Sequence, residues 1–221
     1  MIRRRTAFNT SVSNAIVTPC PGGSDALLDV SPRNRVKLKI CLVGDSGVGK
    51  SSIIRRYVLD MFDDAYLQTL GAKVTKKSFV LPVFRRGSPV EIVMTIWDIM
   101  GNAGFQELLK ESYFYGCQGV LAVADVTSRT TLEGLDGWID RAWDVAGEVP
   151  VHILVNKVDL VADAGESEDR VRAFSSAYDS PYAFVSAKRG DNVSRAFEEL
   201  ARRIVDPRPA DPVLVDAIAR Y

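Results

Sequence analysis

The chain has few of the side chains that redox, metal or histidine chemistry needs. It has three cysteines, Cys20, Cys41 and Cys117, with no CxxC spacing, and one histidine, His152. An odd number of cysteines without metal-binding spacing predicts free thiols in a reducing compartment and no structural disulfide. A single histidine between two apolar residues predicts a strand histidine whose polar atoms are satisfied, and it disfavours a histidine metal site or a Ser-His-Asp triad.

The sequence also lacks an excess of one charge and long apolar runs. Its 28 Lys plus Arg balance 28 Asp plus Glu, which disfavours a strongly basic protein that binds nucleic acid. No stretch approaches the roughly 18 consecutive apolar residues of a membrane-spanning helix. The last residues contain no cysteine for a prenyl group. We therefore expect a cytoplasmic monomer without a stable membrane anchor.

Composition divides the 221 residues into a body and two tails. Residues 1–35 carry five arginines against two aspartates and show no sustained periodicity, which predicts a flexible N-terminal extension. Residues 206–221 contain three prolines and are expected to form a C-terminal tail. One folded domain is therefore expected over residues 36–205.

Within the body, short runs rich in Val and Ile alternate with helical patterns, which is typical of βαβ units around a mostly parallel sheet. The runs predict strands over residues 36–44, 77–84, 90–98, 119–126, 149–155 and 183–186. Apolar periodicity predicts helices over residues 50–60, 130–146, 168–178 and 193–205. A turn-rich segment at 85–89 predicts an antiparallel hairpin. The predicted fold is a doubly wound α/β fold, with a mostly parallel six-stranded sheet, one antiparallel edge strand and helices on both faces.

The most specific motif lies between the first predicted strand and the first predicted helix. Residues 44–51, GDSGVGKS, match the phosphate-binding pattern GxxxxGK[ST] in its strand-loop-helix context. Glycines let backbone N–H groups face phosphate oxygens, and the helix N-terminus adds a partial positive charge. Lys50 supplies a full charge and Ser51 a hydroxyl for Mg²⁺, so a nucleoside triphosphate fits. The predicted contacts are Gly44, Asp45, Ser46, Gly47, Val48, Gly49, Lys50, Ser51 and Ser52.

Two further motifs follow buried strands, at the sheet edge where α/β proteins bind ligands. An NKxD sequence occupies residues 156–159, and Ser186-Ala187-Lys188 follows the next predicted strand. With the phosphate loop, the order of these motifs resembles that of the small GTPases of the Ras superfamily. The resemblance implies the P-loop NTPase fold of small G proteins. In that family the NKxD aspartate accepts hydrogen bonds from two guanine donors that adenine does not offer as a pair, so GTP is implied over ATP.

The resemblance gives each base-side residue a role. Asp159 would bind the guanine base, Asn156 would bridge the base and the phosphate loop, and the stem of Lys157 would cover the ring. A backbone N–H in the 186–188 motif would reach the guanine carbonyl. The nucleotide implied is therefore GTP or GDP.

The middle motif is Trp97-Asp98-Ile99-Met100-Gly101, a DxxG at the end of a predicted strand. In the family, the aspartate holds Mg²⁺ through water and the glycine N–H meets the γ-phosphate. Asp98 and Gly101 take those places here by resemblance. Gly44-Asp45-Ser46 and Trp97 are similar to Rab-like members, while residues 69–74 and 97–101 look more like prokaryotic or archaeal relatives.

Three residues after the first helix have the spacing of a first switch segment. Phe62, Tyr66 and Thr69 lie 12, 16 and 19 residues beyond Lys50, as in Ras-type and Rab-type proteins. By resemblance, Phe62 would touch the guanine edge and Thr69 would bind Mg²⁺ only in the triphosphate state. The alternatives are a core aromatic for Phe62 and a solvated loop hydroxyl for Thr69.

One position departs from the family pattern. Most active relatives carry Gln directly after the DxxG glycine to orient the attacking water, and this chain has Asn102, whose amide is one methylene closer to the backbone. We therefore expect slow intrinsic hydrolysis; the alternative is a GTP-binding interaction module that never turns over. A nucleoside or shikimate-type kinase is disfavoured by the base motifs. Arg55 and Arg56, like Arg85 and Arg86, are expected on solvated faces.

The sequence thus predicts a Mg²⁺-dependent GTP/GDP switch with GTPase activity. Effector, exchange-factor and activating proteins are implied as partners. The catalytic residues implied by the resemblance are Lys50, Thr69, Gly101 and Asn102, and the implied Mg²⁺ ligands are Ser51, Thr69 and Asp98.

Overall fold

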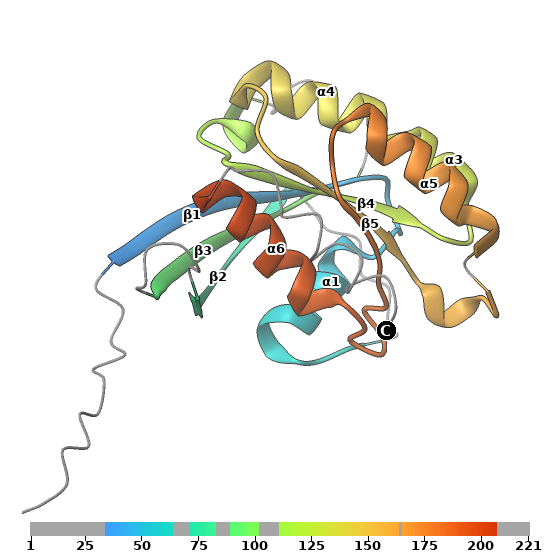
Figure 1. Cartoon of the computed structure of the whole chain (residues 1–221), viewed down its shortest axis with the longest axis horizontal. Coiled ribbons are helices and arrows are strands. Elements are labelled where there is room, and N and C mark those ends of the chain that lie inside the picture. Colours follow the sequence, from blue (N-terminus) through green and yellow to red (C-terminus); the bar gives the residue numbers. More distant parts are fainter. Residues whose placement is uncertain (1–33, 64–70, 83–88, 102–110, 164, 207–221) are drawn as a thin grey trace, which may run out of the picture. The chain divides into compact units, whose positions relative to one another are not determined.

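The computed structural model describes residues 34–63, 71–82, 89–101, 111–163 and 165–206. These residues form a six-stranded sheet and its covering helices (Figure 1). The strands are β1 (Asn34–Val43), β2 (Ala72–Leu81), β3 (Val90–Ile99), β4 (Gly119–Asp125), β5 (Val151–Asn156) and β6 (Tyr182–Phe184). The helices are α1 (Lys50–Leu59), α3 (Arg129–Glu133), α4 (Leu135–Ala146), α5 (Gly165–Ala177), α6 (Val193–Val205) and the short 3₁₀ turn η1 (Val158–Leu160).

The strands are ordered β2-β3-β1-β4-β5-β6. β1 is parallel to both β3 and β4, and β5 is parallel to β4 and β6. Only β2 is antiparallel, and it pairs with β3 from Ala72 opposite Ile99 to Leu81 opposite Val90. The predicted doubly wound fold is confirmed. β3 lies on one side of β1 and β4 on the other, so the strand order reverses at β1. The loop after β1 therefore lies at a topological switch point, where open α/β sheets bind ligands.

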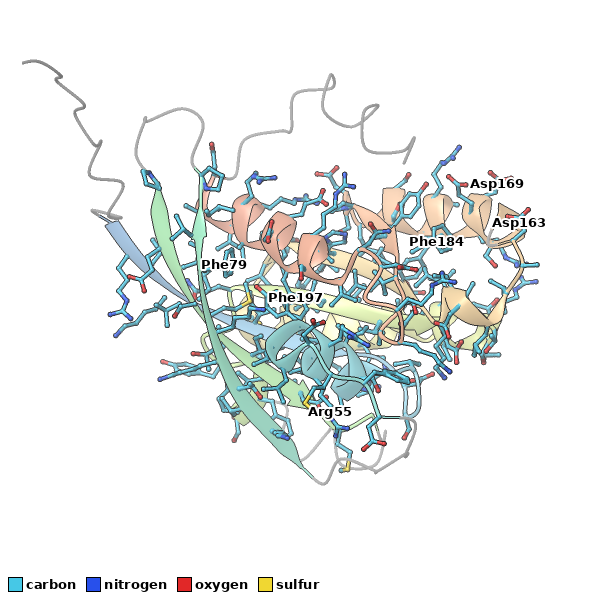
Figure 2. All side chains as sticks on the ribbon, turned by 90° about the horizontal axis from the view of Figure 1, so that it is seen from below. Arg55, Phe79, Asp163, Asp169, Phe184 and Phe197 are labelled. Carbon is cyan, nitrogen blue, oxygen red and sulfur yellow. The ribbon has the colours of Figure 1, made fainter. Side chains whose placement is uncertain are left out.

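An apolar layer covers each face of the sheet. On one face, α1 and α6 pack together, and the rings of Tyr57 and Phe197 stack with centroids 3.9 Å apart; Figure 2 shows Phe197 between these two helices. On the other face, α4 contributes Trp138 and Ile139 to a second buried cluster. β4 and β5 are therefore buried on both sides, which explains why the sequence shows continuous apolar runs there.

β2 begins at Ala72, five residues before the predicted start at Lys77. It is an edge strand, and its exposed positions mix lysines with valines such as Val74 and Val80. The prediction missed its first half because an edge strand with this composition has no clear apolar alternation. The predicted end at Phe84 lies outside the described residues.

The predicted helix over 130–146 is two helices, α3 and α4, that meet at Gly134. A Cβ atom on Gly134 would lie 3.2 Å from a carboxylate oxygen of Asp45 in the loop after β1. Four residues further along, the indole Nε1–H of Trp138 donates to Asp45 Oδ1 at 3.0 Å. A glycine at the junction therefore lets α4 approach the loop, and the indole hydrogen bond joins them.

Cys41 and Cys117 are buried free thiols, as predicted, and Cys20 lies outside the described residues. Among the helices of the described residues, none is long and apolar enough to cross a membrane.

His152 departs from the predicted satisfied strand histidine. It lies in β5 and is fully buried, but among the described residues neither imidazole nitrogen has a hydrogen-bond partner of good geometry. Burial, together with the positive charges of Arg203 and Arg195 on α6, lowers the pKa of His152 to about 3, although the backbone of Ala196 opposes this effect. The imidazole is therefore neutral at physiological pH.

This burial predicts a pH dependence of folding stability. An unfolded histidine has a pKa of about 6.5, so between pH 6.5 and 3 the unfolded chain binds a proton that the folded chain does not. His152 thus destabilises the fold as the pH falls below 6.5 and has no such effect above it. Urea unfolding of wild type and His152→Leu should give a stability difference that changes by about 1.4 kcal/mol per pH unit between pH 6 and 4. A pH-independent difference would contradict this.

The indole contact with Asp45 predicts a measurable coupling between α4 and the loop. A double-mutant cycle of Trp138→Phe with Asp45→Ala, followed by urea unfolding, should give a coupling energy of about 1.5 kcal/mol. Each single variant already loses the hydrogen bond to the carboxylate, so the double variant loses nothing more from it. Trp143→Phe, on the same helix, is the matched control, since its indole donates to Val149 O instead of Asp45. Equal coupling for both tryptophans would disprove the contact.

Candidate functional site

The loop after β1 has a conformation that requires glycine at two positions. Gly44 has φ +131°, and a Cβ atom there would lie 2.2 Å from Val123 O. Gly49 has φ +99°, and its Cβ would lie 2.3 Å from Asn156 Nδ2. L side chains rarely adopt such φ values, and both positions also lack space for one. The loop therefore folds tightly against β4 and against the end of β5.

Lys50 begins α1 and points back into the loop that precedes it. Its side chain is buried, and Nζ donates to Gly44 O at 2.6 Å and to Asp45 O at 2.8 Å. An ammonium group has three donors, so these bonds fix the loop and leave one donor for a ligand. Burial lowers the pKa of Lys50 to about 8, although Asp98 and Asp45 oppose this effect. The group is therefore a buried cation, suited to an anion such as phosphate.

Ser51 and Asp98 place two kinds of oxygen beside this cation. The Ser51 hydroxyl donates to Asp98 Oδ2, and Asp98 is buried near the end of β3. A hydroxyl and a carboxylate are ligands that Mg²⁺ prefers, usually together with phosphate oxygens and water. Within the described ranges no group of three His, Cys, Asp or Glu side chains could hold a metal by itself. The pair therefore fits a Mg²⁺ ion that a phosphate would share; Thr69, the third predicted ligand, lies outside the described residues.

The DxxG glycine lies directly on the phosphate-binding loop. A Cβ atom on Gly101 would be 2.5 Å from both Asp45 C and Ser46 N, so only glycine allows this approach. The preceding residue, Met100, donates its backbone N–H to Gly71 O at 3.0 Å. The end of β3 thus reaches the loop after β1, while Asn102 lies outside the described residues.

One buried amide joins the loop to the two base-side motifs. Asn156 ends β5 and is 1% exposed. Its Nδ2 donates to Val48 O at 2.9 Å, and its Oδ1 accepts from the backbone N–H of Ala187 at 3.1 Å. These partners are 108 and 31 residues away in the sequence. The NKxD motif, the 186–188 motif and the phosphate-binding loop therefore meet at one side chain.

The other NKxD side chains are also fixed by contacts. Ser186 donates its hydroxyl to Asp159 Oδ1 at 2.5 Å. Lys157 has φ +69° and forms an ion pair with Asp125 Oδ2 at 2.6 Å. Burial raises the pKa of Asp125, but the hydrogen bonds from Lys157 and Thr127 outweigh it and hold that pKa below its ordinary value. The carboxylate therefore remains ionised near neutral pH and fixes Lys157.

The residues of the predicted first switch are only partly described. Phe62 is half-buried: part of its side chain packs against the apolar layer beneath α1, as the core-aromatic alternative requires, and part of it is exposed. Tyr66 and Thr69 lie outside the described residues.

Sequence reasoning missed Trp138 and Arg56. Arg56 was predicted on a solvated face, and this prediction is wrong: its Nε donates to Ala187 O at 2.9 Å and its Nη2 to Lys188 O at 2.6 Å. Arg55 instead lies on the side of α1 away from α6 and forms an ion pair with Asp63 at 3.3 Å (Figure 2). No motif signals the Arg56 contacts, because its acceptors are backbone carbonyls 131 and 132 residues away.

Comparison with known proteins identifies relatives over most of the chain. A protein-family model described as "Ras family" matches residues 39–206. The Ras-related protein Rab-7b of Mus musculus is 35% identical over 181 residues, covering 79% of this chain and 85% of that protein. The GTP-binding protein YPTM2 of Zea mays is 30% identical over 189 residues, covering 85% and 90%. The Ras-related protein Rab-1A of Dictyostelium discoideum is 31% identical over 176 residues, covering 79% and 84%.

These three relatives come from eukaryotes, so they do not support the expectation of a prokaryotic or archaeal type. The chain belongs to the Ras family, among its Rab-like small GTPases.

Proposed function

We propose that this protein is a GTP/GDP switch that requires Mg²⁺ and hydrolyses GTP slowly. The observation that carries the proposal is the Asn156 bridge, because one buried amide brings a phosphate-binding loop and two base-side motifs into one site. Members of the Ras family are GTPases, which supports the same function. The proposed nucleotide-binding domain covers residues 36–205.

The triphosphate would lie over the loop at 44–52. The Lys50 ammonium, buried and already holding the loop in shape, would donate its remaining N–H to phosphate oxygens. Ser51 and Asp98 would hold Mg²⁺, which supplies charge neutralisation between the phosphates when bound. Thr69 would add a ligand in the triphosphate state.

The guanine base would lie beside the ends of β5 and β6. Asp159, with one carboxylate oxygen fixed by Ser186, would accept hydrogen bonds from the two guanine donors. Lys157, fixed by its ion pair with Asp125, would cover the ring with its stem. Adenine does not offer the same donor pair, so the site would select GTP over ATP. Phe62 and Tyr66 would border the base or ribose.

Hydrolysis would depend on position and charge alone, with no covalent intermediate on the protein. The backbone N–H of Gly101 would meet the γ-phosphate, and the amide of Asn102 would orient the attacking water. An activating protein would supply further charge. Loss of the γ-phosphate would release the segments around Thr69 and Gly101, which is the switching step.

Effector and exchange-factor proteins would bind beside these segments. The exposed apolar side chains of Val74 on β2 and Tyr115 lie on the described elements that flank them, with exposures of 47% and 79%. Lys39 connects β3, the neighbour of β2, with the segment that carries Tyr115, since its ammonium lies 4.1 Å from the Trp97 ring centroid and donates to Tyr115 O at 2.7 Å. A monomer in the reducing cytoplasm is consistent with buried free thiols.

The experiment that tests the function is single-turnover conversion of bound GTP to GDP. Purified protein is loaded with GTP and Mg²⁺, and the nucleotide is separated by chromatography over time, with Lys50→Ala as the control and ATP as competitor. Slow conversion in the wild type alone, unaffected by ATP, is expected. Intact bound GTP after many hours would contradict GTPase activity. It would establish the alternative, a GTP-binding interaction module in which Asn102 marks the loss of catalysis.

The short amide at position 102 predicts the effect of lengthening it. Asn102→Gln restores one methylene of reach toward the attacking water, and a recovery of about 2 kcal/mol in the transition state corresponds to roughly thirtyfold faster single-turnover hydrolysis. GTP affinity should be unchanged, because the residue acts on the water. Equal rates for the two proteins would contradict the role of Asn102.

A further inference from the structure

We propose that Arg56 is a positioning residue for base recognition, because its guanidinium fixes the direction of the backbone at Ala187 and Lys188. The inference rests on the proposed function, in which a backbone N–H of this segment meets the guanine carbonyl. It concerns a helix residue outside every sequence motif.

The guanidinium spans two successive carbonyl groups of the segment. Nε donates to Ala187 O at 2.9 Å and Nη2 donates to Lys188 O at 2.6 Å. Two donors in a rigid planar group, facing two acceptors one residue apart, set both the position and the rotation of the backbone between them. A lysine ammonium offers one nitrogen on a flexible stem instead of two nitrogens in a rigid plane, so it would not fix the rotation of the backbone in this way.

The third nitrogen of the guanidinium is held by the end of the same helix. Nη1 donates to Asp60 O at 3.2 Å and to Asp60 Oδ1 at 3.1 Å. Asp60 has φ +52° and donates its own N–H to Arg56 O at 3.0 Å, closing α1. The arginine side chain is only 18% exposed. Arg56 is therefore fixed on α1 before it contacts the loop, so it can impose a direction on the carbonyls.

The direction of each carbonyl determines the direction of the next N–H. In a planar trans peptide, C=O and N–H point to opposite sides. With Ala187 O turned toward Arg56, the Lys188 N–H points away from α1, and the Ala187 N–H points to Asn156 Oδ1 at 3.1 Å. Arg56 thus orients the Lys188 N–H through the Ala187 carbonyl, and Asn156 orients the Ala187 N–H directly.

The test measures affinity for three diphosphates that differ only in the base. GDP and inosine diphosphate both carry the 6-carbonyl, whereas 2-aminopurine riboside diphosphate lacks it. Each is titrated against the full chain loaded with a fluorescent GDP analogue, for wild type, Arg56→Lys and Arg55→Lys. Arg55 is the matched control, one position earlier on α1 and bound to Asp63 instead of the loop.

Arg56→Lys should weaken the binding of GDP and of inosine diphosphate by the same factor, about tenfold. This is the loss expected when a misdirected N–H no longer makes its hydrogen bond to the base. The affinity for 2-aminopurine riboside diphosphate should not change, because that base has no carbonyl for the N–H to meet. Arg55→Lys should leave all three affinities unchanged.

Asp60→Gly is a second variant that keeps the fold, because glycine suits φ +52° and the Asp60 side chain is exposed. It removes the ion pair that holds the guanidinium, and it should weaken the binding of GDP and of inosine diphosphate by about twofold, the size expected for an exposed ion pair.

Three results would overturn the role. Equal losses of affinity for all three nucleotides would mean that Arg56 is merely structural. Unchanged affinities in Arg56→Lys, with tight binding by the wild type, would contradict the role of Arg56 and leave the proposed function standing. A wild type that binds none of the three would overturn the proposed function, and the role of Arg56 with it.

Discussion

The two hydrogen bonds of the Asn156 side chain are the constraint on which the site depends. A buried amide has both a donor and an acceptor to satisfy, and here they bind Val48 of the phosphate-binding loop and Ala187 of the last motif. Leaving either unmade would leave a buried polar group without its partner, which costs about 1–3 kcal/mol. The loop and the base-side segments are therefore held together by hydrogen bonds within the protein.

The sheet makes this bridge geometrically available. β1 and β5 are parallel to the strand between them, β4, so their carboxyl ends lie at the same edge of the sheet, and the loop after β6 joins them there. Helices on both faces then add contacts from the side: Trp138 of α4 binds Asp45, and Arg56 of α1 binds the carbonyls at 187–188. The core elements and the site are thus parts of one packing arrangement.

The mostly parallel sheet, its antiparallel edge strand and the motif positions could be predicted because each produces a local pattern: a buried run, a turn-rich connection or a fixed spacing. The contacts of Arg56 and Trp138 could not be predicted, because their partners are distant in sequence and, for Arg56, are backbone atoms that every residue has. The same limit applies to His152, whose burial was predicted but whose missing partners depend on the residues packed around it. Gly134 lies within a continuous helical pattern in the sequence, so nothing there marks a junction. Its role in letting α4 approach Asp45 depends on the packing of the helix against the loop.

The central claim is that Asn156 makes the phosphate-binding loop and the 186–188 segment one unit. Amide hydrogen exchange, followed by mass spectrometry on GDP-loaded wild type and Asn156→Ala, tests it most directly. The account predicts that the backbone amides of both segments exchange faster in the variant, while those of β4, which keeps its strand pairing, exchange as in the wild type. Faster exchange in only one of the two segments, or in neither, would contradict the claim.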